Sequence, residues 1–228
     1  LRRYIGLDRS SDESVSDDRY LKAYTLLVNE KQAEAADQIL YDYYQRQLRI
    51  GQGTVSNYSG IAGVEFRRGR SKEALEFLQR MVAIIGTDQA LVSAGKLAES
   101  YGFHKEAFGW REKAAKLNPS LGENRLELAR NAALVGQNQV AVDLLKLLIE
   151  NRETDNTLRA QAIALIPTVA GKDASNMLAA FQNNPDYSAQ LVTAGLLIAT
   201  NRNAEARTIL QQAGKLTTAA QARLMLAA

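Results

Sequence analysis

Apolar and polar residues alternate along the middle of the chain with a period close to that of an α-helix. Between residues 89 and 121, small or apolar side chains fall at Leu91, Ala94 and Ala98, whereas Lys96 falls on another face. Positions three and four apart share one face of a helix. The pattern therefore predicts an amphipathic helix in the first half of this stretch.

A second helix of the same kind is predicted directly after the first. Gly102 is expected to end the first helix, because glycine readily adopts the positive φ that closes one. Ala107 follows five positions later, and Ala114 and Leu117 continue its stripe until Pro119, which cannot extend a helix. Two helices of about fourteen residues joined by a tight turn make an antiparallel hairpin.

A helix-ending residue followed five positions later by alanine recurs along the chain. The pairs are Gly69/Ala74, Gly102/Ala107, Gly136/Ala141 and, with asparagine in place of glycine, Asn201/Ala206. The first two spacings are 33 and 34 residues, and the 65 residues from Gly136 to Asn201 leave room for a further hairpin near Gly171. The first hairpin is predicted around Glu30 and Ala35. A hairpin cannot bury its apolar stripe alone, so these copies are expected to stack.

The period and the placement of small residues resemble the tetratricopeptide repeat (TPR). That family has Trp, Leu-Gly and Tyr on the first helix, then Ala, an aromatic residue, Ala and Pro on and after the second. In residues 89–121 the positions that agree with this pattern are Ala94, Gly95, Ala107, Ala114 and Pro119. The positions that depart from it are Leu91, Ala98 and Arg111, which stand where the large aromatic residues would be.

The resemblance implies an all-α fold, a right-handed superhelix (solenoid) of antiparallel hairpins with about six TPR-like repeats. We expect a lead-in segment at residues 1–16 and a single helical-repeat domain at residues 17–228. Because the chain begins at Leu1 and ends within a predicted helix, it is expected to be a piece of a longer protein. Pro167 is expected to kink or shorten its helix.

In this family the first helix of each hairpin lines the concave face of the superhelix. The resemblance therefore implies protein-binding positions at Tyr20, Tyr24, Phe66, Arg67, Val92, Lys96, Glu99, Leu126, Glu127 and Arg130. Such a face would suit an extended or helical segment with acidic and apolar side chains. The set lacks the Lys/Asn combination by which some members clamp a peptide's terminal carboxylate. The alternative for each position is a solvated side chain with no partner.

Composition narrows the function classes. The 228 residues include no cysteine, which excludes disulfide frameworks, zinc knuckles and thiol catalysis. The net charge of +3 comes from 28 basic and 25 acidic residues without a basic cluster, so no nucleic-acid partner is expected. No apolar run reaches the roughly 18 residues of a membrane span, so direct membrane insertion is not expected. The compartment stays open between a bacterial cytoplasm and a periplasm.

No arrangement of residue types indicates catalysis. The single histidine, His104, is expected to be an exposed surface residue, and it has no serine or carboxylate at a triad spacing. Glu123 and Glu127 lie one turn apart, but Arg125 stands between them, as on a solvated helix face with ion pairs. Metal-ligand spacings are absent. We therefore predict no enzyme activity, no cofactor and no metal.

Two functions from different classes follow. The first is a protein–protein interaction scaffold that binds a peptide or protein segment in the concave groove. The second is a structural spacer in a larger assembly, for example of a bacterial envelope, without a specific groove ligand. Self-association through the terminal helices is a further mode open to either.

The hairpin hypothesis predicts the effect of enlarging Ala107. A leucine at this position would overpack the helix interface, so Ala107→Leu is expected to lower the free energy of unfolding by about 1–3 kcal/mol. Thermal melting of the variant measures this loss. An unchanged melting temperature would contradict the predicted interface.

Overall fold

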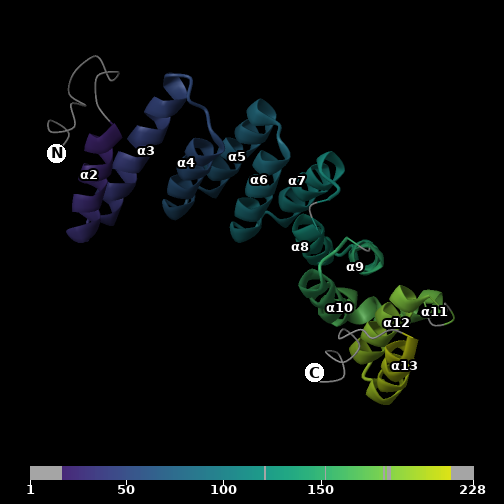
Figure 1. The fold of residues 1–228 in the computed structure, drawn as a ribbon. Coiled ribbons are helices and arrows are strands. Elements are labelled where there is room, and N and C mark those ends of the chain that lie inside the picture. The colour runs from purple at the N-terminus through teal and green to yellow at the C-terminus, as the bar shows by residue number, and fades with distance from the viewer. Residues whose placement is uncertain (1–16, 121, 152, 182, 184–185, 217–228) are drawn as a thin grey trace. The chain divides into compact units, whose positions relative to one another are not determined.

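Helices make up the regular structure of the residues that the computed structural model describes, which are 17–120, 122–151, 153–181, 183 and 186–216 (Figure 1). No strand occurs in these ranges, so the predicted all-α fold is confirmed. The lead-in segment at 1–16 and the helix predicted after residue 216 lie outside the described residues.

The helices divide into two compact units, Leu1–Phe103 and His104–Ala228. The single domain expected over residues 17–228 stays a prediction.

The first unit contains five described helices. They are α2 (Asp17–Asn29), α3 (Ala33–Arg49), α4 (Val55–Arg67), α5 (Ser71–Ile85) and α6 (Asp88–Ser100). Each helix packs on the next along the chain, and α4 also packs on α6. Short connections join the neighbours, so α2 with α3 and α4 with α5 form antiparallel hairpins.

The second unit continues the same construction. Its helices are α7 (His104–Leu117), α8 (Gly122–Leu134), α9 (Asn138–Glu150), α10 (Asn156–Ala170), the 3₁₀ turn η2 (Gly171–Asp173), α11 (Ala174–Phe181), α12 (Tyr187–Ala199) and α13 (Asn203–Leu216). Consecutive helices pack from α7 to α10, and α12 packs against α10, α11 and α13. The eight-residue α11 makes this hairpin shorter than the others.

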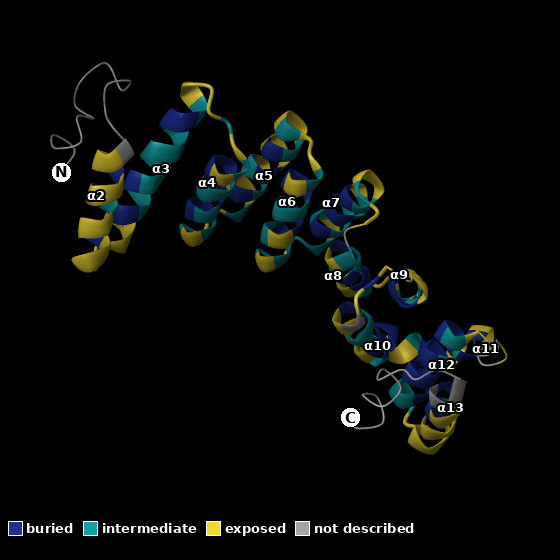
Figure 2. Cartoon of the chain, in the orientation of Figure 1, coloured by how far each residue is buried: buried dark blue, intermediate teal, exposed yellow. Residues whose placement is uncertain are grey.

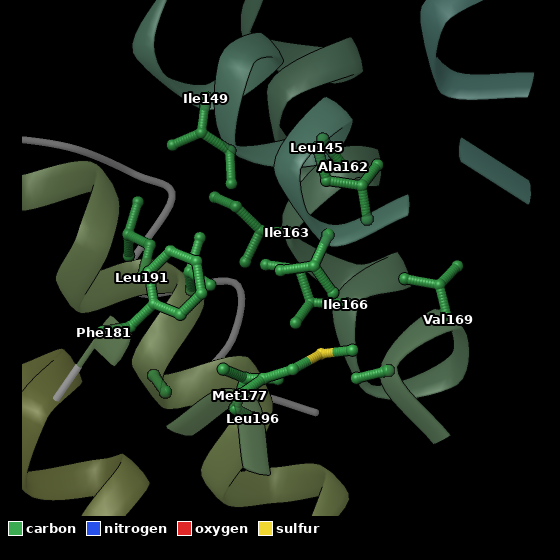
Figure 3. Close-up of a cluster of buried hydrophobic side chains, with 14 of the residues drawn as sticks. Leu145, Ile149, Ala162, Ile163, Ile166, Val169, Met177, Phe181, Leu191 and Leu196 are labelled. Atoms are coloured by element: carbon green, nitrogen blue, oxygen red, sulfur yellow. The ribbon is translucent and has the colours of Figure 1, made fainter. Parts of the chain in front are cut away.

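Apolar side chains between the helices of the second unit form its core (Figure 3). Leu145 of α9, Ile166 of α10 and Leu191 of α12 are completely buried. Most helices in both units turn buried positions toward their neighbours and exposed positions outward, whereas α12 has no exposed position (Figure 2). Burying one such side chain contributes roughly 1.5–3 kcal/mol, so packing between helices rather than helix propensity holds the units together.

The helices α2, α4, α6, α8 and α12 end in the same way. The second residue after each helix has a positive φ, and these residues are Lys31, Gly69, Gly102, Gly136 and Asn201. The next N–H donates to the carbonyl five residues back, as Arg70 does to Glu65 at 2.9 Å. This bond is the signature of a Schellman motif, which satisfies carbonyls that the helix end leaves free.

An alanine five residues after each of these turns is buried. Ala74, Ala107 and Ala141 are completely inaccessible, and Ala206 is nearly so. The first hairpin is one residue out of the predicted register, because Lys31 rather than its neighbour has the positive φ of 57°. Ala36 is therefore the buried alanine, and the prediction of Glu30 with Ala35 is wrong.

Of the two effects predicted for Pro167, a kink or a shortened helix, the structure contradicts the shortening. Helix α10 continues for three residues beyond the proline and ends at Ala170, and the N–H of the next residue, Gly171, donates to the Pro167 carbonyl. A proline inside a helix costs about 3 kcal/mol, because it removes one backbone hydrogen bond and crowds the preceding turn. The buried side chains of Ile163, Ile166 and Val169 on both sides of the proline offset that cost.

The close approach of α10 and α12 predicts the effect of adding one methyl group. A β-carbon at Gly195 would lie 2.7 Å from Cγ2 and 2.8 Å from Cβ of Ile166. We expect Gly195→Ala to lower the free energy of unfolding by about 1–3 kcal/mol in urea denaturation. At Gly109, in α7, a β-carbon would meet nothing within 4 Å. Gly109→Ala should therefore raise the free energy of unfolding by about 0.5–1 kcal/mol. Equal effects of the two changes would contradict this packing.

Candidate functional site

Aromatic and basic side chains gather on one side of α4 in the first unit. The Arg67 site, as we name it, consists of Tyr24, Asp37, Gly63, Phe66, Arg67 and Tyr101. Gly63, Phe66 and Arg67 share a helix face because they are three and four positions apart. Helices α2 and α3 and the end of α6 supply the other members.

Phe66 and Tyr101 form a stacked pair across α4 and the end of α6. Their ring centroids are 4.0 Å apart and their planes are inclined by 15°. The N–H of Tyr101 donates to the carbonyls of Leu97 and Ala98, which fixes the residue at the end of α6. Both rings are only partly buried, so the pair presents a rigid apolar surface to solvent.

Arg67 is held in place by a carboxylate of the preceding hairpin. Its Nε lies 3.0 and 3.2 Å from the two carboxylate oxygens of Asp37, and Nη2 also donates to Asp37. The Arg67 side chain is 53% exposed and that of Asp37 17%. An ion pair this exposed contributes only about 0–1 kcal/mol to stability. Its main consequence is therefore the orientation of the guanidinium.

The protonation states at the site follow from these contacts. The hydrogen bond with Asp37 raises the pKa of Arg67, although desolvation opposes it. Burial raises the pKa of the Tyr101 hydroxyl, and the charge of Arg67 lowers it by less. At neutral pH the guanidinium is therefore charged and the Tyr101 hydroxyl is protonated, so both act as hydrogen-bond donors.

An open cleft of about 1070 Å³ begins at Arg67 and runs between the first turns of α3 and the end of α4. It is lined by Ala33, Glu34, Ala35, Asp37, Gln38, Arg67, Arg68 and Arg70. Two of its arginines are tied down, because Arg68 donates to Gln38 at 2.9 Å and Arg70 donates to Glu65 at 3.0 Å. The α4 side of the cleft is therefore basic and of fixed geometry, whereas the α3 side carries the acidic Glu34 and Asp37.

The fold is TPR-like. Its hairpins have turns that recur at 33 and 34 residues, with a buried alanine after each. No family model matches the sequence, and no curated protein matches it.

Solved structures with similar helix arrangements include three repeat proteins. MamA is 14% identical, with 77% of this chain and 95% of that chain covered and a TM-score of 0.49. A tetratricopeptide repeat protein from Parabacteroides merdae is 12% identical over 86% and 77%, also with a TM-score of 0.49. YrrB, described as a TPR protein with an unusual peptide-binding site, is 17% identical over 80% and 96%, with a TM-score of 0.43. At these identities the likeness concerns the arrangement of helices and not ligands.

Two of the residues predicted to bind a partner belong to the core instead. Tyr20 of α2 is 1% exposed and packs against Tyr43 with a centroid distance of 5.6 Å. Leu126 of α8 is 3% exposed and belongs to the core of the second unit. The structure corrects the prediction for both, because a buried side chain offers no surface to a partner.

The other predicted residues in the first unit fall on α2, α4 and α6. Tyr24, Phe66 and Arg67 come together in the Arg67 site. Val92 and Lys96 lie on α6, the former partly buried and the latter exposed, and Glu99 is partly buried near the end of the same helix.

The remaining predicted residues form a separate set in the second unit. Glu127 accepts a hydrogen bond from Arg130 at 3.0 Å, one turn along α8.

His104, expected to be exposed, is partly buried, and its Nδ1 has no hydrogen-bond partner among the described residues. In the described ranges, no three histidine or acidic side chains gather as metal ligands. None of the helices described there is long and apolar enough to cross a membrane.

Asp37 and Tyr101 belong to the site but were not among the predicted residues. Asp37 lies on the second helix of a hairpin, thirty positions before Arg67, and Tyr101 lies one residue beyond the end of α6. The resemblance points only to first helices, so it indicated neither. The one general signal for Asp37 is that an exposed arginine such as Arg67 favours a carboxylate as its partner.

The raised pKa of Tyr101 predicts a difference in stability at alkaline pH. Below pH ~10, the usual pKa of tyrosine, the hydroxyl is protonated in both folded and unfolded chains. Above it, the unfolded chain ionises first, so the free energy of unfolding falls as pH rises through the folded pKa. Urea denaturation should show a smaller fall across this window in Tyr101→Phe, which cannot ionise. Parallel curves for the two proteins would contradict the shift.

Proposed function

We propose that this chain is a protein–protein interaction scaffold whose first unit binds a segment of a partner at the Arg67 site. The observation that carries the proposal is the stacked Phe66–Tyr101 pair, which stays partly exposed beside an arginine that Asp37 orients. An apolar surface and an oriented charged group thus lie next to each other on the surface.

The physical chemistry of interfaces supports this use of the pair. Aromatic residues and arginine are enriched among the residues that dominate binding energy, and the centres of interfaces are well packed. The rings and the guanidinium are already held by the contacts described above, so binding would cost little side-chain entropy. The neighbouring α6 carries the partly buried Val92 and the exposed Lys96, which supply one apolar and one basic side chain.

The residues on α8 support a second, weaker contact in the other unit. Glu127 and Arg130 satisfy each other's charge, and both side chains are partly exposed to water. Such a pair adds little affinity when a partner replaces the surrounding water. The first unit is therefore the better place to test binding.

Peptide selection tests the proposal with ligands drawn from random sequences. A phage-displayed library of random peptides would be panned on the whole chain, and selected peptides measured against Phe66→Ala. We expect at least about a tenfold loss of affinity, equivalent to about 1.4 kcal/mol, because the variant removes half of the stacked surface.

Phe77 provides a matched control. It is also a partly exposed phenylalanine with a nearby arginine, since the Arg80 guanidinium lies 5.6 Å from its ring, but it sits on α5. Selected peptides should bind Phe77→Ala as tightly as the wild type. A library that yields no binder, or binders indifferent to Phe66→Ala, would contradict the proposal and favour the spacer.

A further inference from the structure

The Arg67 site contains a small niche above Gly63 at which two hydrogen-bond donors converge. A β-carbon built on Gly63 would lie 3.5 Å from Arg67 Nη1 and 3.6 Å from the Tyr101 hydroxyl oxygen. Both groups therefore reach the space that a side chain at this position would occupy. Because glycine has none, a small group of a ligand can approach them there.

The two donors at the niche can each donate a further hydrogen bond. Asp37 engages Nε and Nη2 of Arg67, which is one edge of the planar guanidinium. No described residue accepts a hydrogen bond from Nη1, and none in the described ranges is hydrogen-bonded to the Tyr101 hydroxyl. A guanidinium offers five N–H donors in a fork that fits carboxylates, so the Nη1 side is available to a second acceptor.

We propose that this niche binds the carboxylate of an aspartate or glutamate side chain in the partner segment, and that the Phe66–Tyr101 surface takes an apolar residue beside it. The inference rests on the function proposed above and names the chemistry of its ligand. Arg67 Nη1 and the Tyr101 hydroxyl donate to the carboxylate.

The surroundings favour a side chain within the segment over a chain end. The open cleft is lined by Arg67 and by residues of α3, whereas the stacked rings come from α4 and the end of α6. A segment that uses both surfaces passes over the niche and continues beyond it. Its terminal carboxylate is then elsewhere, and an internal acidic residue faces Nη1.

A double-mutant cycle with the selected peptides tests this inference. Each peptide would be synthesised with an amidated C-terminus, and its acidic residues changed one at a time to the matching amide. One such change should weaken binding to the wild type about tenfold, because it removes a charge-assisted hydrogen bond. The same change should have little effect on binding to Arg67→Gln. Changing that acidic residue to lysine should abolish binding to the wild type and restore it with Arg67→Glu.

Two further variants separate the niche from general charge and from folding. Arg80→Gln removes another exposed arginine, on α5. Changing the acidic residue of the peptide to the amide should weaken binding to this variant as much as it weakens binding to the wild type. Tyr101→Phe keeps the stacked ring but removes the hydroxyl, so it should weaken binding by about three- to tenfold only for peptides that carry the acidic residue. Thermal melting of each variant establishes that it is folded.

The outcomes distinguish the inference from the proposed function. Peptides that lose affinity with Phe66→Ala but have no required acidic residue would overturn the inference and leave the function standing. Peptides that bind only with a free C-terminus would overturn it in favour of a terminal carboxylate. A library without any binder would overturn both.

Discussion

The fold depends on how closely two helices approach at the turn that joins them. A residue with positive φ ends the first helix, its successor returns a hydrogen bond to the carbonyl five positions back, and the next helix begins at once. A larger side chain at Ala74 or Ala141, both completely buried, would push the helices apart. Because the same constraint recurs at each turn, hairpins of similar shape follow one another and share their apolar surfaces.

The same turn also helps to build the candidate site. After α4, the Arg70 N–H donates to the Glu65 carbonyl, and the Arg70 side chain binds the buried Glu65 carboxylate. These contacts fix the end of the helix that carries Phe66 and Arg67. The preceding hairpin then supplies Asp37 to orient the guanidinium. The site thus arises from contacts between hairpins, and an isolated hairpin would not have it.

The helices were predictable from the sequence because their signals are local. Apolar spacing and glycine at turns placed most hairpins, but Lys31 takes a conformation that is typical of glycine, so the first turn was one residue out. The site was less predictable. Side chains on first helices were expected at the surface, yet Tyr20 and Leu126 are buried. Tyr20 packs inside its own hairpin against Ile39 and Tyr43 of α3. Leu126 is buried because α8 packs on α7, α9 and α10. Asp37 belongs to the site through its contact with Arg67, thirty positions later in the sequence, and no periodic signal in the sequence indicates that contact.

The pairing of Arg67 with Asp37 affects two quantities, which are the entropy cost of ordering the arginine on binding and the stability of the packing between the two hairpins. An unpaired arginine would move among many rotamers, and a ligand would have to order it at a cost of about 0.5–1.5 kcal/mol. Asp37 removes that cost while engaging only one edge of the guanidinium. Because the pair connects α3 with α4, the proposed ligand on the other edge would bind best when the two hairpins are packed. Binding would then stabilise their packing by mass action and couple interaction to folding in the first unit.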